Sequence, residues 1–332
     1  MAGAAVGAQD LQAWLATRTR WRAVEIAFWL ACLTPYVLAP DYLQLASQIA
    51  IAALFALSLD LVLGYAGLIS LGHAAFFGLG AYTAGLLAAN GWGEPLSGLA
   101  AAAVFTGACG FLVSFVVVRF RGLALIMITL GLAQMLESAA NSANWLTGGA
   151  DGLQGVAMQP LFGAFSFDLW GRTAYAYSLA VLFLVFLLVR RITNSPFGLS
   201  LRGIRENESR MTALGASNRA HLRKAFTLAA AIAGMAGALL TQTTQTASLQ
   251  TLGFQKSADV LVMLVLGGAG RLYGGLLGAL VYMIARDQFS DVDPQYWYFW
   301  IGLLLIAVMT FLPGGILGGL SRLLERRRSR AK

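Results

Sequence analysis

The chain has 332 residues, of which 58% are hydrophobic and only 11% are charged. Soluble domains carry about 25% charged residues, so this composition excludes a water-soluble enzyme, a disulfide-stabilised secreted module and a disordered protein. The 23 basic and 15 acidic side chains give a net charge of +8. In a membrane protein such an excess bears on orientation, and we expect no nucleic acid as a partner. We expect an all-α, polytopic membrane protein that forms a single transmembrane domain over residues 1–332.

Apolar stretches long enough to cross a bilayer follow one another along the chain. About 20 apolar residues span the hydrocarbon core, and such windows lie at 22–40, 45–64, 70–89, 97–118, 122–141, 174–190, 224–246 and 296–312. The stretch 258–284 is also apolar, but glycines and Arg271 interrupt it. Because a charge at the centre of a continuous span is costly, we expect a broken or re-entrant segment made of two pieces, 258–270 and 274–284. The prediction is about eight transmembrane helices and eight to ten crossings.

Basic residues collect in the loops of one predicted side of the membrane. With a cytoplasmic N-terminus, 19 of the 23 basic residues fall in the N-terminal segment, the loops near 119–121 and 190–224, and the tail 318–332. Acidic residues such as Asp168 and Asp293 fall on the opposite side. Since cytoplasmic loops are enriched in Lys and Arg, both termini are predicted to be cytoplasmic, with 318–332 a basic cytoplasmic tail.

The sequence contains no motif typical of nucleotide binding, metal binding or nucleophilic catalysis. There is no Gly-Lys dipeptide and hence no phosphate-binding loop of the usual kind. The two histidines, His73 and His221, show no metal-ligand spacing, and no nucleophile stands beside a base. We predict that the chain is not an enzyme, holds no cofactor or metal, and depends on a partner for energy.

The cytoplasmic loop 193–222 carries a short amphipathic pattern. Its apolar positions at near-helical spacing are Leu201, Ile204, Met211 and Leu214. Glu206 and Arg210 stand four residues apart in the order that favours an exposed pair, and Gly215 suits a left-handed helix end. The pattern predicts a short surface helix that either docks on a soluble partner or rests on lipid headgroups.

Polar side chains inside predicted spans are candidates for a substrate path. A stripe on the fifth span consists of Gln134, Glu137, Ser138 and Asn141. This stripe either lines a path or forms hydrogen bonds to a partner helix. Asp60, just before the Gly64–Gly67 break, either caps that break or contacts substrate. His73, at the start of the next span, is either a structural histidine or part of the path.

Five motifs, in the same order, resemble the permease subunits of bacterial ABC importers for branched-chain amino acids, of the LivM type in particular. They are LGYAGLISLGHAAFFGLGAY at 63–82, TGGADGLQGV at 147–156, RENESRMTALG at 205–215, LGGAGRLYG at 266–274 and FLPGG at 311–315. The likeness runs from about 45 to 318 and so covers most of the chain. The sequence departs from the family pattern at Asp60, where an amide is more usual.

The resemblance implies that the region 205–215 is the coupling loop on which an ATPase subunit sits. The residues expected to make this contact are Glu206, Glu208, Arg210, Leu214 and Gly215. The implied partners are a second homologous permease chain, two ATP-hydrolysing subunits, a periplasmic solute-binding protein and membrane lipid. The implied location is the bacterial cytoplasmic membrane.

The translocation path is predicted at polar residues of the spans, namely Gln134, Glu137, Asn141, Asp60 and His73. Two other interpretations stay open. An ion-coupled secondary transporter of a small polar solute could use Asp60 and Glu137. An ABC permease for urea, amides or aromatic acids would share the architecture and differ in substrate.

Overall fold

The computed structural model describes residues 23–38, 40–163, 165–168, 170–312 and 314–319. The principal helices are α2 (Ala23–Ala31), α3 (Thr34–Leu38), α4 (Leu43–Asp60), α5 (His73–Ala89), α6 (Pro95–Val117), α7 (Gly122–Ser142), α8 (Asn144–Thr147), α9 (Arg172–Thr193), α10 (Pro196–Glu206), α11 (Glu208–Ala213), α12 (Asn218–Thr244), α13 (Phe254–Gly267), α14 (Leu272–Val292) and α15 (Trp297–Phe311). Within these ranges no strand occurs, and β-pairing is limited to isolated bridges, Leu153–Ala247 and Leu161–Phe165. The predicted all-α, polytopic fold is confirmed.

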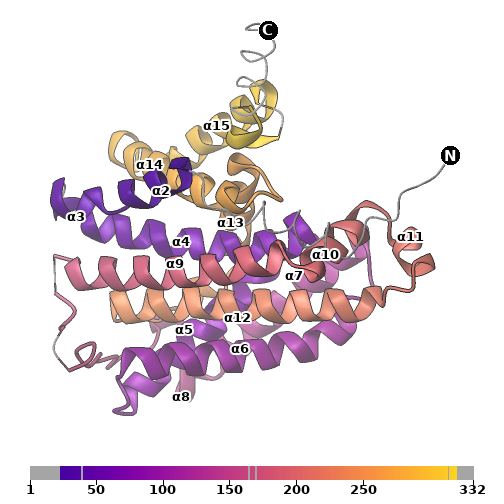
Figure 1. Ribbon diagram of the computed structural model, residues 1–332. Coiled ribbons are helices and arrows are strands. Elements are labelled where there is room, and N and C mark those ends of the chain that lie inside the picture. Colours follow the sequence, from indigo (N-terminus) through magenta and orange to yellow (C-terminus); the bar gives the residue numbers. More distant parts are fainter. Residues whose placement is uncertain (1–22, 39, 164, 169, 313, 320–332) are drawn as a thin grey trace, which may run out of the picture.

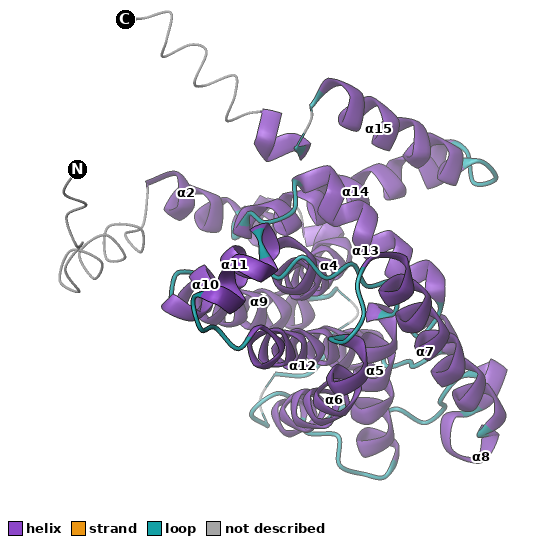
Figure 2. Ribbon diagram, turned by 90° about the vertical axis from the view of Figure 1, so that its right-hand side faces the viewer, coloured by secondary structure: helices purple, strands orange, loops and turns teal. Residues whose placement is uncertain are grey.

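Helix α12 is the centre of the bundle. It packs against α6, α5 and α4, while α9 packs along α4. Figure 1 shows α4, α9, α12 and α6 running side by side, and Figure 2 shows α13, α14 and α15 grouped on one side of this body. The bundle therefore has a densely packed part around α12 and a second part built on the broken segment.

Glycines allow the helix backbones to touch at the centre of the bundle. A side chain on Gly80 of α5 would collide with the backbone of Gly234 on α12, and one on Gly237 would collide with the carbonyl of Phe77. Small residues serve this purpose at helix contacts in membranes, where apolar burial alone does not distinguish helix from lipid. The α5–α12 contact is thus made backbone to backbone.

In the part of the chain that the structure describes, six helices are long and apolar enough to cross a membrane, or seven if the bent pair α13–α14 is one span. The six are Pro40–Tyr65, Pro95–Val117, Gly122–Ser142, Arg172–Thr193, Asn218–Thr244 and Trp297–Gly319. Two further predicted spans appear as shorter apolar helices, Ala23–Leu38 and His73–Ala89. The predicted number of about eight is therefore approximate.

The first predicted span, 22–40, is not one continuous helix. α2 ends at Ala31 and α3 begins at Thr34. Pro35 cannot donate a backbone hydrogen bond, and its ring crowds the carbonyl four residues earlier. That carbonyl, on Ala31, instead accepts a hydrogen bond from the Thr34 hydroxyl at 2.7 Å. The proline thus divides the apolar stretch.

The predicted break within 258–284 is present. The chain bends by 114° from α13 to α14, and the residues between them include Gly268 at φ +106° and Gly270 at φ +80°. This positive-φ backbone favours glycine. A side chain on Gly267, the last residue of α13, would collide with the backbone of Gly274 on α14, so the two helices are in close contact at the break. Both helices are longer than the predicted pieces.

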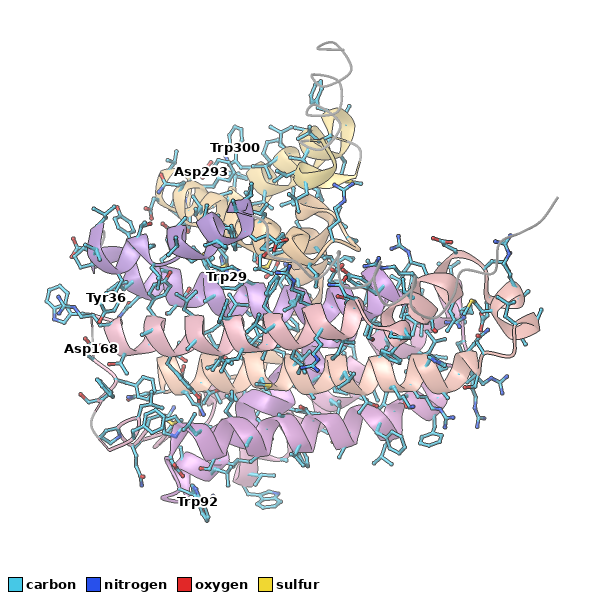
Figure 3. All side chains as sticks on the ribbon, viewed as in Figure 1. Trp29, Tyr36, Trp92, Asp168, Asp293 and Trp300 are labelled. Atoms are coloured by element: carbon cyan, nitrogen blue, oxygen red, sulfur yellow. The ribbon has the colours of Figure 1, made fainter. Side chains whose placement is uncertain are left out.

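The loops predicted to lie on opposite sides of the membrane lie at opposite ends of the bundle. Figure 3 shows Tyr36, Trp92 and Asp168 at the end opposite to α10 and α11. The predicted outer loop 142–173 is fastened at that end, since the Leu153 N–H donates to the carbonyl of Ala247 at 2.8 Å. The N-terminal basic segment and the predicted tail from residue 320 onward lie outside the described residues.

Candidate functional site

The loop between α9 and α12 folds into two short helices, α10 and α11. α10 begins after Ser195, whose hydroxyl accepts from the N–H of Gly198 at 3.5 Å, with Pro196 in the first turn. α11 begins after Asn207, whose side-chain oxygen accepts from the N–H of Arg210 at 2.9 Å. Asparagine is among the preferred residues at a helix start because it can satisfy a free N–H there. The prediction of a single surface helix is therefore wrong, since Asn207 follows the end of α10 and caps α11.

The apolar stripe predicted along this loop is divided between the two helices. Leu201 and Ile204 of α10 are 0% and 4% exposed and belong to the core of the bundle. Met211 of α11 is half-buried, whereas Leu214 is 74% exposed. α10 is thus packed on the membrane bundle, and α11 projects from it. Gly215 has the predicted left-handed conformation, at φ +84°.

The charged side chains at the end of α10 and on α11 have different surroundings. Glu208 forms an ion pair with Arg121, at the start of α7, with distances of 2.9 and 3.1 Å. The predicted pair between Glu206 and Arg210 is not formed, and both side chains are exposed without an ion-pair partner among the described residues. Glu206, Arg210 and the exposed Leu214 therefore form the free face of the loop.

Arginines of α10 reach the end of α4, which continues as a π-helical turn over Leu61–Tyr65. The guanidinium of Arg202 lies over the ring of Tyr65, 4.9 Å from its centroid. Arg205 donates a hydrogen bond to the carbonyl of Gly64. The loop is therefore attached to the break that follows α4.

Asp60 connects this first break to the second one. Its carboxylate is 1% exposed, and Oδ1 accepts a hydrogen bond from the N–H of Gly270 at 2.7 Å. A side chain on Gly64 would collide with this carboxylate and with the backbone of Gly270. Asp60 therefore caps the break between α13 and α14. The prediction that it caps the break after α4, at Gly64–Gly67, is wrong. We call Asp60, Gly64, Arg205 and Gly270 the coupling cluster.

His73 lies inside the bundle. It is 1% exposed, its Nε2 is 2.9 Å from the hydroxyl of Ser58, and its ring stacks on Phe55 with 5.7 Å between centroids. These contacts come from the same chain and hold α5 against α4. A role of His73 in a path stays a prediction.

The polar stripe of α7 lies on a helix with little cover from its own chain. Gln134 and Asn141 are exposed and Glu137 is half-buried, while the side-chain amide of Gln134 donates to Glu137 at 3.2 Å. Only 17% of this candidate span is buried. Exposed polar groups on a membrane helix call for a further polar surface beside them.

A comparison with protein families accounts for this architecture. Residues 42–309 match the model of the family described as branched-chain amino acid transport system, permease component. The chain belongs to this family.

Relatives of this permease are similar over most of its length. It is 30% identical over 314 residues to the high-affinity branched-chain amino acid transport system permease protein LivM of Escherichia coli K12, covering 87% of this chain and 72% of that protein. To the LivH permease protein of the same organism it is 27% identical over 287 residues, covering 80% and 91%. A probable LivM of Methanocaldococcus jannaschii is 30% identical over 162 residues, covering 42% and 44%. No solved structure matches significantly.

The permease's coupling cluster was only partly visible in its sequence. Asp60 was singled out, but its partner Gly270 and the contact of Arg205 with Gly64 were not. The position of Asp60 within an apolar span was a usable signal, because a buried carboxylate requires a hydrogen-bond donor. Backbone N–H groups left free at a break such as 267–271 are available donors.

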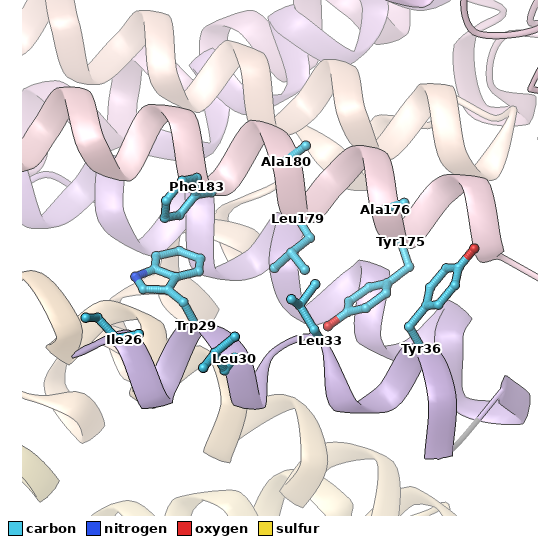
Figure 4. A pocket seen from close by; sticks show the side chains of 10 residues that line it. All are labelled: Ile26, Trp29, Leu30, Leu33, Tyr36, Tyr175, Ala176, Leu179, Ala180 and Phe183. Atoms are coloured by element: carbon cyan, nitrogen blue, oxygen red, sulfur yellow. The ribbon is translucent and has the colours of Figure 1, made fainter. Parts of the chain in front are cut away.

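The permease also carries a large apolar groove between α2–α3 and α9. Figure 4 shows Trp29 facing Phe183, with Leu33 beside Tyr175, and the two facing rings have centroids 4.8 Å apart. The groove has a volume of about 670 Å³, and the residues that line it are almost wholly apolar. Such a surface suits lipid chains or an apolar helix and offers no group to orient a charged amino acid.

Proposed function

We propose that this chain is one permease subunit of an ATP-binding-cassette importer located in the cytoplasmic membrane of a bacterium. A second, homologous permease chain completes the path, and two separate ATPase subunits supply the energy. The observation that carries this proposal is the two-sided arrangement of the coupling loop. The loop presents Glu206 at the end of α10, Arg210 on α11 and Leu214 just after α11 outward. α10 is attached through Arg205 to Gly64 in the break after α4.

Such a loop suits the transmission of force. A partner that moves α11 also moves α10, since Asn207 joins them directly and Leu201 and Ile204 anchor α10 in the bundle. Through its hydrogen bond to the carbonyl of Gly64, Arg205 then moves the π-helical turn Leu61–Tyr65. Asp60 links this turn to Gly270. A packed unit of this kind has discrete arrangements rather than a continuous range. The coupling cluster thus provides a route from ATPase to both breaks.

The substrate proposed is a small amino acid, in particular a branched-chain one. Relatives named for branched-chain amino acid transport support this choice. We propose that a periplasmic binding protein delivers it to the bundle end opposite to α11. Exposed indoles at that end, with Trp92 62% and Trp170 65% exposed, fit such a contact, because aromatic side chains are enriched at protein interfaces.

The decisive experiment is reconstitution of the chain with its second permease, the two ATPases and the binding protein in liposomes. Uptake of radiolabelled leucine should require ATP on the ATPase side and all subunits. Uptake driven by an ion gradient without the ATPases would contradict the proposal and favour a secondary carrier. Urea, an amide and an aromatic acid, offered with the same subunits, test the substrate class.

Orientation is part of the proposal, with α11 and both termini cytoplasmic. The test is a cysteine at Ser209 or at Asn90, introduced after replacing Cys32 and Cys109 with serine. A membrane-impermeant maleimide should label the variant at Ser209 in inside-out vesicles and the variant at Asn90 in right-side-out vesicles. The reverse pattern would contradict the proposed orientation.

The structure offers less support for a carrier that uses Asp60 and Glu137. Asp60 is enclosed in the coupling cluster, with Oδ1 bonded to Gly270. Glu137 lies on α7 and bonds to Gln134. A shared ion site requires oxygen ligands gathered around one point, and these two carboxylates take part in separate sets of contacts.

A further inference from the structure

A small cavity with charged walls lies between α4, α13 and α14. Polar residues on its wall are Gln48, Lys256, Asp259 and Arg286, and apolar ones include Ile51, Phe55, Phe77 and Met263. Gln48 precedes Asp60 by 12 residues on α4, which corresponds to about 18 Å of helix. The cavity therefore lies toward the bundle end opposite to the coupling cluster.

The carboxylate in this cavity is held by neutral donors. Asp259 is 7% exposed, and its Oδ1 accepts hydrogen bonds from the hydroxyl of Tyr282 at 2.8 Å and from the amide of Gln255 at 3.1 Å. Neither donor carries a charge. The negative charge of Asp259 thus has no direct ionic partner among the described residues, in a poorly solvated position.

The two cations on the cavity wall also keep their donors free. Lys256 is half-buried, and its ammonium forms no hydrogen bond or ion pair with any described residue. Arg286 lies over the ring of Trp297, 5.1 Å from its centroid, and has no ion-pair partner among the described residues. A partly buried ammonium and guanidinium with unused donors require an anion. Two positive charges and one negative charge line the cavity, so one further negative charge would balance them.

We infer that this cavity is a subsite for a zwitterionic α-amino acid with an apolar side chain. The α-carboxylate would lie at Lys256 and Arg286, and the α-ammonium at Asp259. The apolar side chain would then lie against Ile51, Phe55 and Phe77. This inference rests on the proposed function and assigns residues of this single chain to recognition of its substrate.

The cavity is small in this structure. Its volume is about 70 Å³, against roughly 300 Å³ or more for typical small-molecule sites. Two of its walls, α13 and α14, meet at the glycine break that Asp60 caps. A change at the coupling cluster would therefore alter the angle between the two helices and open the subsite.

The test measures binding of radiolabelled L-leucine to the assembled importer in nanodiscs, without binding protein and without nucleotide. Omitting the binding protein removes its own specificity from the result. Asp259→Asn keeps an oxygen for the hydroxyl of Tyr282 but removes the charge, and Lys256→Met keeps the length of the side chain. Loss of one charge-assisted contact should weaken leucine binding about tenfold or more. The KM for uptake should rise by a similar factor, with a smaller change in kcat.

Control variants separate recognition from folding. Lys256→Arg keeps the positive charge and should retain binding. Asp287→Asn removes a carboxylate one residue after Arg286, at a position that lines a different, apolar cavity, and should leave leucine binding unchanged. Should Asp259→Asn fail to assemble, the comparison of Lys256→Met with Lys256→Arg decides, because the Lys256 side chain forms no ion pair with a described residue whose loss would leave a buried partner.

Competition tests the two charges of the ligand. 3-Methylbutylamine lacks the carboxylate of leucine and 4-methylpentanoate lacks its ammonium, so both should compete at least about tenfold more weakly than leucine. Leucine binding that is absent from the wild type, or unchanged in both charge variants, would overturn this inference while ATP-dependent uptake stood. Failure of ATP-dependent uptake by the wild-type importer would instead reject the proposed function.

Discussion

Arg121 at the start of α7 and Glu208 at the start of α11 form a two-pronged ion pair, with distances of 2.9 and 3.1 Å. The pair joins the coupling loop to the helix that carries the polar stripe. Both side chains remain well exposed, at 39% and 45%, so the pair contributes only about 0–1 kcal/mol to stability. Its effect is to fix the position of α11 relative to α7.

Exchanging the charges of this pair tests that role. Glu208→Arg alone should reduce leucine uptake per ATP hydrolysed, because α11 loses its ion pair with Arg121. The free energy of unfolding should change by less than about 1 kcal/mol. Adding Arg121→Glu should restore most of the coupling. The readouts are uptake and ATPase activity of the same proteoliposomes.

A matched control uses Glu206, which has no ion-pair partner among the described residues. Coupling lost through Glu206→Arg should not return when Arg121→Glu is added, since the two side chains do not meet. If the Glu208→Arg, Arg121→Glu double variant stays as poorly coupled as Glu208→Arg, Glu208 acts on the ATPase itself and not through Arg121.

Gly64 should tolerate no side chain. A methyl group there would meet the carboxylate of Asp60 and the backbone of Gly270, and overpacking of this kind costs at least about 1–3 kcal/mol. We expect Gly64→Ala to lower the thermal stability of the detergent-purified chain and to abolish coupled uptake. Gly131→Ala is the control, because nothing lies within 4 Å of its added methyl group. Equal behaviour of the two variants would contradict the tight packing of the coupling cluster.

Local signals in the sequence were sufficient for much of the fold. Hydropathy placed the helices, glycines with Arg271 marked the break within 258–284, and Gly215 marked a helix end. In each case the cause lies within a few residues, such as the positive φ that Gly268 and Gly270 adopt. Such features are predictable because they depend on the backbone and on apolar length alone.

Contacts between distant segments could not be predicted in this way. Asp60 and Gly270 are 210 positions apart, and their meeting depends on how α4 packs against α13 and α14. Lys256 and Arg286 likewise line one cavity from two helices. In the coupling loop the apolar spacing continued across Asn207, so periodicity alone suggested one helix. The cap at Asn207 separates them because its side chain satisfies the N–H of Arg210.

Asp60→Asn and Asp60→Ala should differ sharply. An amide oxygen can accept the bond from Gly270 that Oδ1 now accepts, so Asn should assemble and retain most leucine uptake. Alanine leaves the buried N–H without a partner, at a cost of about 1–3 kcal/mol, and should lose coupling. Uptake and recovery of the assembled complex are the measurements. Equal loss in both variants would show that the negative charge beside Arg205, rather than the acceptor, is required.

The polar stripe of α7 should form hydrogen bonds to the second permease chain. Gln134 and Asn141 are exposed on a span of which only 17% is buried by its own chain. Interhelical hydrogen bonds in membranes contribute about 0.6 kcal/mol each on average. Changing both residues to leucine should therefore reduce the second chain recovered with this one by several-fold, as measured by co-purification.

Two variants of the same helix complete this test. Met135 is 60% exposed but lies off the stripe, so Met135→Leu should leave the recovery of the second chain unchanged. Glu137→Gln keeps a polar group bonded to Gln134 and should also preserve assembly. Altered uptake in Glu137→Gln with full recovery of the complex would place the stripe on the substrate path instead. The same helix face would then carry solute rather than bind the partner, since its polar groups can bond to one or the other.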